Sequence, residues 1–161
     1  MTGICSSLFK TNGCWGSFFA RLALGGVMLP HGLQKTVGAF GGNGFSGTMG
    51  FFTGTLGLPS AIAFLVIMAE SLGAIAILLG FMTRFSAASL AVVMAGAACM
   101  GHLQNGFFMN WFGAQAGEGF EYHLLAIGLC LVLVACGGGA LSLDCKLSSC
   151  GDTKAGSCCS R

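Results

Sequence analysis

The chain has 161 residues, of which 55% are hydrophobic and only 7% are charged, and its mean hydropathy is +0.84. A soluble domain carries about 25% charged residues, so this composition excludes an ordinary soluble protein and predicts an integral membrane protein of one domain. The net charge of +2 provides no basic surface for nucleic acid, so we expect no nucleic-acid partner.

Four apolar stretches are long enough to cross a hydrocarbon core of about 30 Å as helices. In chain order they cover about 17–37, 59–80, 84–103 and 119–137. The sequence therefore predicts an all-α fold, an integral membrane four-helix bundle over residues 17–144. An N-terminal segment, 1–16, precedes the bundle, and a Cys-rich tail, 145–161, that we expect to be flexible follows it.

The basic residues predict how the spans are oriented. With four spans, six basic residues fall on the side of the two termini: Lys10, Arg21, Arg84, Lys146, Lys154 and Arg161. Only Lys35 falls on the other side. Because cytoplasmic segments carry the excess of Lys and Arg, both termini and the tail are predicted to be cytoplasmic.

Two long connections, 38–59 and 103–119, are predicted as loops on the outer side. Both are rich in glycine and aromatic residues, and neither contains Lys or Arg. The second holds four large aromatic side chains: Phe107, Phe108, Trp111 and Phe112. These either form an aromatic belt at the membrane interface or cap a cavity in the outer leaflet.

Glu70 lies near the middle of the apolar run SAIAFLVIMAESLGAIAILLG. A carboxylate at that depth costs about 2.5–3.5 kcal/mol on insertion scales unless it faces protein, water or a partner. At a rise of 1.5 Å per residue, Glu70 lies about 15 Å from the outer end of its helix and His31 about 9 Å from its own. Either a protonated carboxyl bridges two helices here, or Glu70 belongs to a functional site.

Other polar side chains also gather toward the outer side of the predicted bundle. Gln34 and Lys35 share a helix face with His31, since they follow it at i+3 and i+4. His102 ends the third span, and Glu121 and His123 open the fourth. Glu121 is also explained by the helix dipole and Lys35 by snorkelling, so these roles stay open. Taken together, the pattern predicts an outward-facing polar pocket with Glu70 at its floor.

Several segments follow one another in a characteristic order: ARLALGGVMLPHGLQK, GFSGTMGFFTG, FLVIMAESLGAIAILLGFMTR, GHLQNGFFMNWFGAQAGEGFEYHLL and GGGALSLD. In this order and spacing, over about residues 18–144, they resemble the DoxX family of small four-helix bacterial membrane proteins. The resemblance implies a multi-pass protein of the bacterial inner membrane. It also implies a relation to the membrane subunit of thiosulfate:quinone oxidoreductase.

The first functional hypothesis is a membrane subunit of a quinone-linked redox system, concerned with sulfur compounds or thiol stress. In it, Glu70 and His31 are the catalytic residues that bind or protonate a quinone head group. The expected substrate-binding residues are Lys35, Gln34, His102, Glu121 and His123. The sequence shows no flavin, haem or iron–sulfur motif, so electrons are expected from a partner subunit, from a direct thiol reaction or from an unrecognised metal.

Two other hypotheses belong to different classes. The chain is alternatively a non-catalytic anchor or assembly factor that holds soluble redox partners at the lipid membrane. The third option is copper handling, in which His31, His102 and His123 are weak candidates for metal ligands. A homo-oligomer is compatible with each hypothesis.

Overall fold

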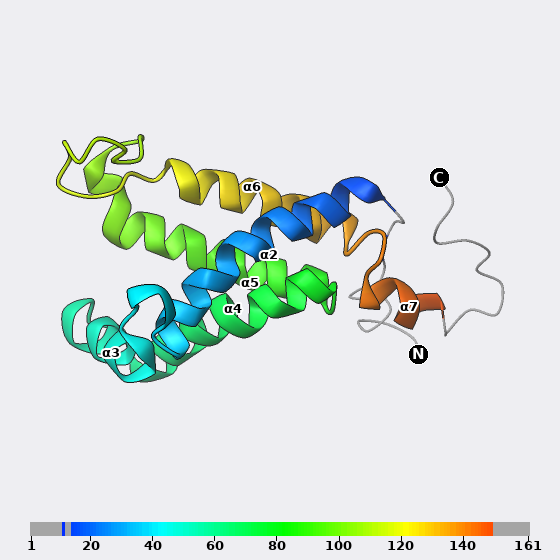
Figure 1. Cartoon of the computed structure of the whole chain (residues 1–161), viewed down its shortest axis with the longest axis horizontal. Helices are drawn as coiled ribbons and strands as arrows, with labels where there is room; N and C mark the ends of the chain where they lie inside the picture. Colours follow the sequence, from blue (N-terminus) through cyan, green and yellow to red (C-terminus); the bar gives the residue numbers. More distant parts are fainter. Residues whose placement is uncertain (1–10, 12–13, 150–161) are drawn as a thin grey trace.

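The computed structural model describes residue 11 and residues 14–149, and all the regular secondary structure in this part of the chain is helical. Most of the predicted N-terminal segment and the tail beyond residue 149 lie outside the described residues. Four long helices run side by side along the longest axis of the molecule: α2 (Trp15–Thr36), α4 (Ser60–Leu79), α5 (Thr83–Ala97) and α6 (Glu121–Cys136) (Figure 1).

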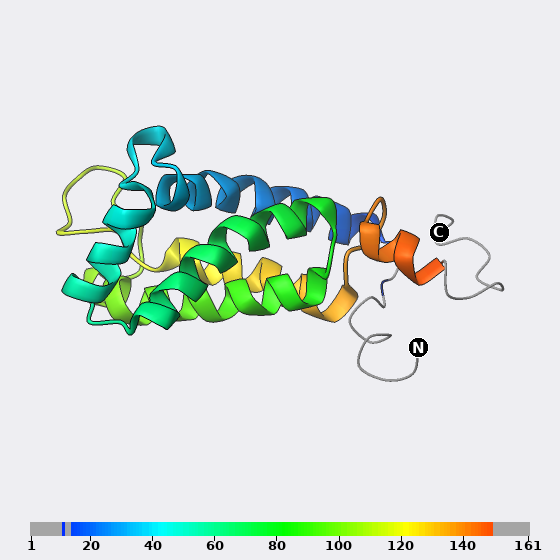
Figure 2. The same ribbon diagram turned by 90° about the horizontal axis from the view of Figure 1, so that it is seen from below.

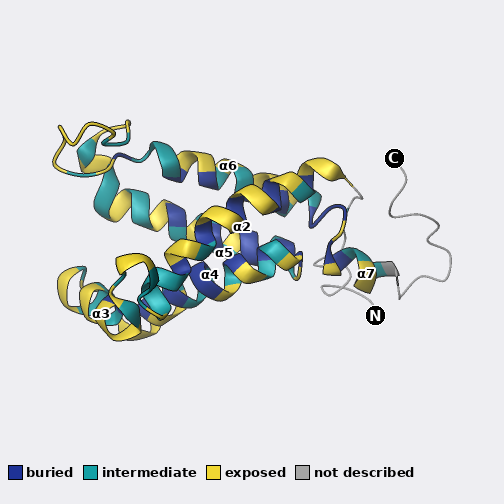
Figure 3. Cartoon of the chain, in the orientation of Figure 1, coloured by how far each residue is buried: buried dark blue, intermediate teal, exposed yellow. Residues whose placement is uncertain are grey.

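The four helices enclose one hydrophobic core. Helix α2 packs against α4 and α6, and α5 packs against the same two helices. The core consists of these buried side chains: Ala20, Leu24, Met28, Ala74, Ile77, Ala87, Leu90, Met94, Ala126, Cys130 and Leu133. Large apolar side chains on the outer faces remain exposed, among them Leu65 (64%), Val92 (73%) and Leu125 (67%) (Figure 3). An apolar exterior of this extent needs an apolar environment.

Glycines on α2 allow it to approach α4 closely. A Cβ on Gly32 would lie 2.6 Å from the carbonyl oxygen of Glu70 and 2.6 Å from the Cα of Ser71. Gly25, two turns earlier on the same face, would meet the side chain of Leu78 at 2.6 Å. Small residues at such positions let helix backbones come together, and here they bring α2 beside Glu70.

The ends of the helices are grouped at two poles of the molecule. The start of α2, the turn between α4 and α5, and helix α7 (Leu143–Ser149) lie at one pole (Figures 1 and 2). The two long connections lie at the opposite pole. This grouping agrees with an even number of crossings, while the cytoplasmic side of the termini stays a prediction.

Buried polar contacts hold the first pole together. Arg21, 1% exposed, donates to the carbonyl oxygens of Leu78 at 3.0 Å and Ala140 at 2.7 Å. Asp144 accepts the backbone N–H groups of Met82 at 2.8 Å and Thr83 at 2.9 Å. Backbone groups at helix ends have no intrahelical partner, so these two side chains satisfy the end of α4 and the start of α5.

Two segments differ from the sequence-based expectations. The connection expected as a loop over 38–59 is largely helical, with η1 (Ala39–Gly41), α3 (Gly44–Gly50) and η2 (Phe51–Thr55). The first residues of the tail that was expected to be flexible, from residue 145, belong to helix α7. The Ser142 hydroxyl caps this helix by accepting the N–H of Cys145 at 3.1 Å. Helices stabilised by local hydrogen bonds of this kind need no periodic pattern of hydrophobic residues, so the sequence pattern did not predict them.

Two of the described helices are long and apolar enough to cross a membrane. They are Ser60–Leu79 and Thr83–Asn105, the second formed by α5 with η3 (Ala98–His102) and η4 (Leu103–Asn105). Helix α6 is apolar but shorter. Crossing of the membrane by all four helices stays a prediction.

Candidate functional site

Glu70 forms a buried ion pair with Lys35. The Nζ of Lys35 donates to Oε2 of Glu70, and the two side chains are 25% and 5% exposed. Lys35 comes one turn after Gly32, whose missing side chain brings α2 against α4 at this height. The carboxylate therefore faces protein, and a cation lies against it, which is the arrangement that a charged group needs at such depth.

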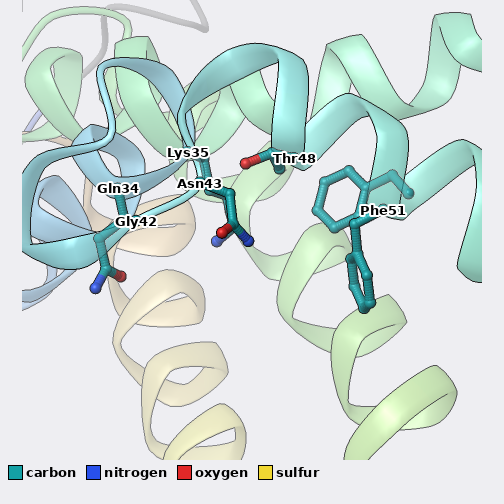
Figure 4. Close-up of a pocket in the computed structure, with 7 residues that line it drawn as sticks. Gln34, Lys35, Gly42, Asn43, Thr48 and Phe51 are labelled. Atoms are coloured by element: carbon teal, nitrogen blue, oxygen red, sulfur yellow. The ribbon is translucent and has the colours of Figure 1, made fainter.

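A pocket of about 310 Å³ opens beside this ion pair. Its lining comes from the end of α2 and from the connection that follows it: Gln34, Lys35, Gly42, Asn43, Thr48, Phe51 and Phe52 (Figure 4). Lys35 belongs both to the pocket wall and to the ion pair. The lining thus contains one lysine, two amide residues, a threonine and two phenylalanines.

A row of four rings runs from α2 across the start of α6 to the end of α5. The ring centroids of His31 and Tyr122 are 6.0 Å apart, those of Tyr122 and His123 are 5.6 Å apart, and those of His123 and His102 are 4.2 Å apart. We call these four residues the ring row. His102 lies on η3, a π-helical turn of the kind that often occurs at functional sites.

Tyr122 connects the ring row to the interior of α2. Its hydroxyl donates to the sulfur of Met28 at 3.2 Å. Tyr122 was not among the predicted site residues. Two signals were present, since Tyr122 is the single tyrosine of the chain and stands between Glu121 and His123.

His123 is the most enclosed member of the ring row. It is 7% exposed, and its Nδ1 has no hydrogen-bond partner among the described residues. A buried polar atom without a protein partner is costly unless an ordered water satisfies it. His102 is half-buried, and its Nδ1 lies 2.9 Å from the carbonyl oxygen of Glu118. Because a carbonyl only accepts, that contact fixes the proton on Nδ1 and leaves Nε2 as an acceptor.

The predicted site residues are thus distributed over three places. Gln34 and Lys35 line the pocket with Glu70 behind them, whereas His31, exposed on α2, belongs with His102 and His123 to the ring row. Glu121 lies in neither group, because its carboxylate accepts the backbone N–H of Met109 at 3.1 Å. The structure therefore gives Glu121 a part in holding the 103–119 connection.

The candidate metal ligands do not form a cluster. Within the described part of the chain, no group of three or more His, Cys, Asp or Glu side chains is arranged to hold a metal ion. His102 and His123 come together as a pair, and His31 is separated from them by Tyr122.

Fold and site together define an all-helical protein with helices of membrane-spanning length and a buried ion pair beside a pocket. The family model described as DoxX matches residues 16–103, more than half of the chain. A protein of Bacillus subtilis (strain 168) named "Putative oxidoreductase CatD" is 30% identical over 129 residues, which cover 80% of this chain and 84% of that protein. The chain belongs to the DoxX family of membrane proteins. No solved structure matches it.

Proposed function

We propose that this chain is the membrane subunit of a quinone-linked redox system that acts on sulfur compounds or thiols. In this proposal α2, α4, α5 and α6 cross the bacterial inner membrane as a four-helix bundle, with both termini in the cytoplasm. Membership of the DoxX family and the name of the Bacillus relative support a redox role. The observation that carries the proposal is that Lys35 belongs to both the pocket and the ion pair.

The pocket has the size and chemistry for a quinone head group. Its volume of about 310 Å³ lies at the lower end of the range for small-molecule sites, roughly 300–1,000 Å³. A quinone ring is flat and apolar with an oxygen at each end, so Phe51 and Phe52 supply contact area for its faces. The Lys35 ammonium group supplies a donor for one oxygen.

Reduction of the quinone adds two electrons and two protons. Two thiols, or an equivalent sulfur reductant presented by a partner subunit, supply both electrons as they form one disulfide and release two protons. Negative charge develops on the quinone oxygen, and the ammonium group of Lys35 stabilises it. Glu70 holds that ammonium group in place and exchanges protons with it. In total, one quinone and two thiols become one quinol and one disulfide, and the two protons released by the thiols equal the two that the quinol gains.

In this proposal the ring row carries protons toward the outer pole. Neighbouring ring centroids are 4.2–6.0 Å apart, and water molecules are proposed to complete the hydrogen bonds between them. The unpartnered Nδ1 of His123 is a position for one such water. The half-buried His102 then exchanges protons with the outside, and the proposal requires a water between the Tyr122 hydroxyl and the Glu70 carboxylate to complete the path.

The proposal is tested by measuring the quinone that copurifies with the protein from native membranes and the rate of quinone reduction by thiols. Lys35→Met is expected to lose bound quinone and turnover, and Glu70→Gln to lose turnover while the protein still folds. Glu118→Gln is the matched control, because that carboxylate is exposed and bonded to the loop N–H of Asn110. Wild-type protein without quinone would refute the proposal. Unchanged partner recovery and activity in Glu70→Gln would favour the anchor hypothesis.

A further inference from the structure

The connection between η4 and α6, residues 106–120, presents large aromatic side chains outward. Phe108, Trp111 and Phe112 are 66%, 79% and 96% exposed. We call this segment the aromatic loop. Side chains of this size are rarely left in water at such exposure without a function.

The polar side chains of the aromatic loop bond to one another and to the loop backbone. The carboxylate of Glu118 accepts the N–H of Asn110 at 2.7 Å, and that of Glu121 accepts the N–H of Met109 at 3.1 Å. Asn110 and Gln115 exchange two further bonds, from Asn110 Nδ2 to the Gln115 carbonyl at 3.1 Å and from the Gln115 N–H to Asn110 Oδ1 at 3.0 Å. These bonds satisfy polar atoms that would otherwise require water.

The two arms of the aromatic loop are also joined by their backbones. The N–H of Phe120 donates to Gly106 at 3.2 Å, and the N–H of Glu121 donates to Phe107 at 2.9 Å. Gly119 makes this approach possible, because a Cβ there would lie 2.4 Å from the carbonyl oxygen of Phe108. These contacts hold the two arms of the loop together.

The position of the aromatic loop indicates what covers these side chains. It directly follows Thr83–Asn105, a candidate membrane span, and it contains no Lys or Arg. It contributes no residue to the pocket at Lys35, which is lined from the other connection. Figure 1 shows the two connections diverging to opposite sides of the same pole, so the loop does not cap that pocket.

We propose that the aromatic loop inserts Phe108, Trp111 and Phe112 into the headgroup and upper acyl region of the outer leaflet. Tryptophan and phenylalanine favour this region, where headgroups and water still bond the exposed polar groups of the loop. The loop then anchors the adjoining ends of η4 and α6 in the bilayer. This inference requires that the chain lies in a membrane but does not depend on quinone chemistry.

The chain contains two tryptophans, Trp15 and Trp111, so Trp15→Phe leaves Trp111 as the single reporter. The full-length variant is reconstituted in phosphatidylcholine nanodiscs whose lipids carry bromine either near the headgroup end or near the methyl end of the acyl chain. We expect blue-shifted emission, loss of most of it with the shallow bromine, weaker quenching with the deep bromine, and protection from iodide.

Phe108→Ser/Phe112→Ser in the same background is expected to reduce lipid quenching, whereas Phe45→Ser on α3 is the matched control and leaves it unchanged. Emission typical of water with full quenching by iodide would overturn the proposal. Blue-shifted emission without lipid quenching would also overturn it, by showing that protein covers Trp111. If that emission shifts on dilution into excess lipid, the cover is a second copy of the chain.

Discussion

Separate removal of the two partners of the Lys35–Glu70 pair is expected to have unequal effects. Removing one member of a buried ion pair costs about 3–5 kcal/mol, because the other charge is left without compensation. Lys35→Met leaves the Glu70 carboxylate, only 5% exposed, in that position and should show this full cost. Glu70→Gln leaves Lys35, which is 25% exposed and borders the pocket, so its ammonium group reaches water and the cost falls to about 1 kcal/mol.

The double variant Lys35→Met/Glu70→Gln distinguishes the interaction energy of the ion pair from the separate contributions of its two side chains. It removes both charges at once, so its loss of stability should fall below the sum of the two single losses by about 2–3 kcal/mol. The measurement is reversible unfolding of the four proteins in the same mixed micelles at neutral pH. Equal single losses, or losses that simply add, would refute the reasoning that Glu70 is the buried and dependent member.

Three further changes test other contacts. Gly32→Ala places a Cβ 2.6 Å from the α4 backbone and should cost about 1–3 kcal/mol in thermal unfolding, whereas Gly26→Ala, with open space around it, should be neutral or slightly stabilising. Asp144→Ala removes the acceptor for two N–H groups at the start of α5 and should cost about 1–2 kcal/mol in the same assay. Tyr122→Phe loses the hydroxyl bond to Met28 and should slow quinone reduction with a larger solvent isotope effect, while stability changes by about 1 kcal/mol or less.

The control outcomes for these changes are specific. A Gly26→Ala protein as damaged as Gly32→Ala would show that helix flexibility, rather than close approach, explains the loss. An Asp144→Ala protein with unchanged unfolding would contradict its capping role. Normal turnover in Tyr122→Phe, measured in both ordinary and heavy water, would remove Tyr122 from the proton path.

The sequence predicted features that depend on composition along the chain. Apolar runs gave the long helices, since burial from water acts on every residue of a run. Glu70 stood out because a carboxylate within a membrane-spanning run is costly whichever way its helix is rotated. The partner of Glu70 was not predicted, because pairing depends on the rotation and separation of two helices. Gly32 sets that separation, and its effect is visible only when α4 is in place.

The division of the predicted site residues between the pocket and the ring row was not predicted, for the same reason. Depth along each helix placed His31, Lys35 and Glu70 on the outer side, but depth says nothing about lateral position. In the structure Lys35 turns to the pocket and His31 to Tyr122. Glu121 was expected at the substrate, yet its carboxylate lies where loop N–H groups need an acceptor. Contacts of this kind within a loop do not repeat along the chain, so no sequence pattern predicts them.

The shared position of Lys35 ties the stability of the site to its proposed chemistry. Water at the pocket opening weakens the attraction between Lys35 and Glu70, but it also lowers the cost of removing the ammonium group from water. Lys35 is 25% exposed and lines the pocket together with Phe51 and Phe52. The exposure that weakens this attraction also lets the ammonium group of Lys35 contact a ligand in the pocket. In the proposed function, this partly exposed ammonium group would stabilise a ligand oxygen that becomes negative on reduction.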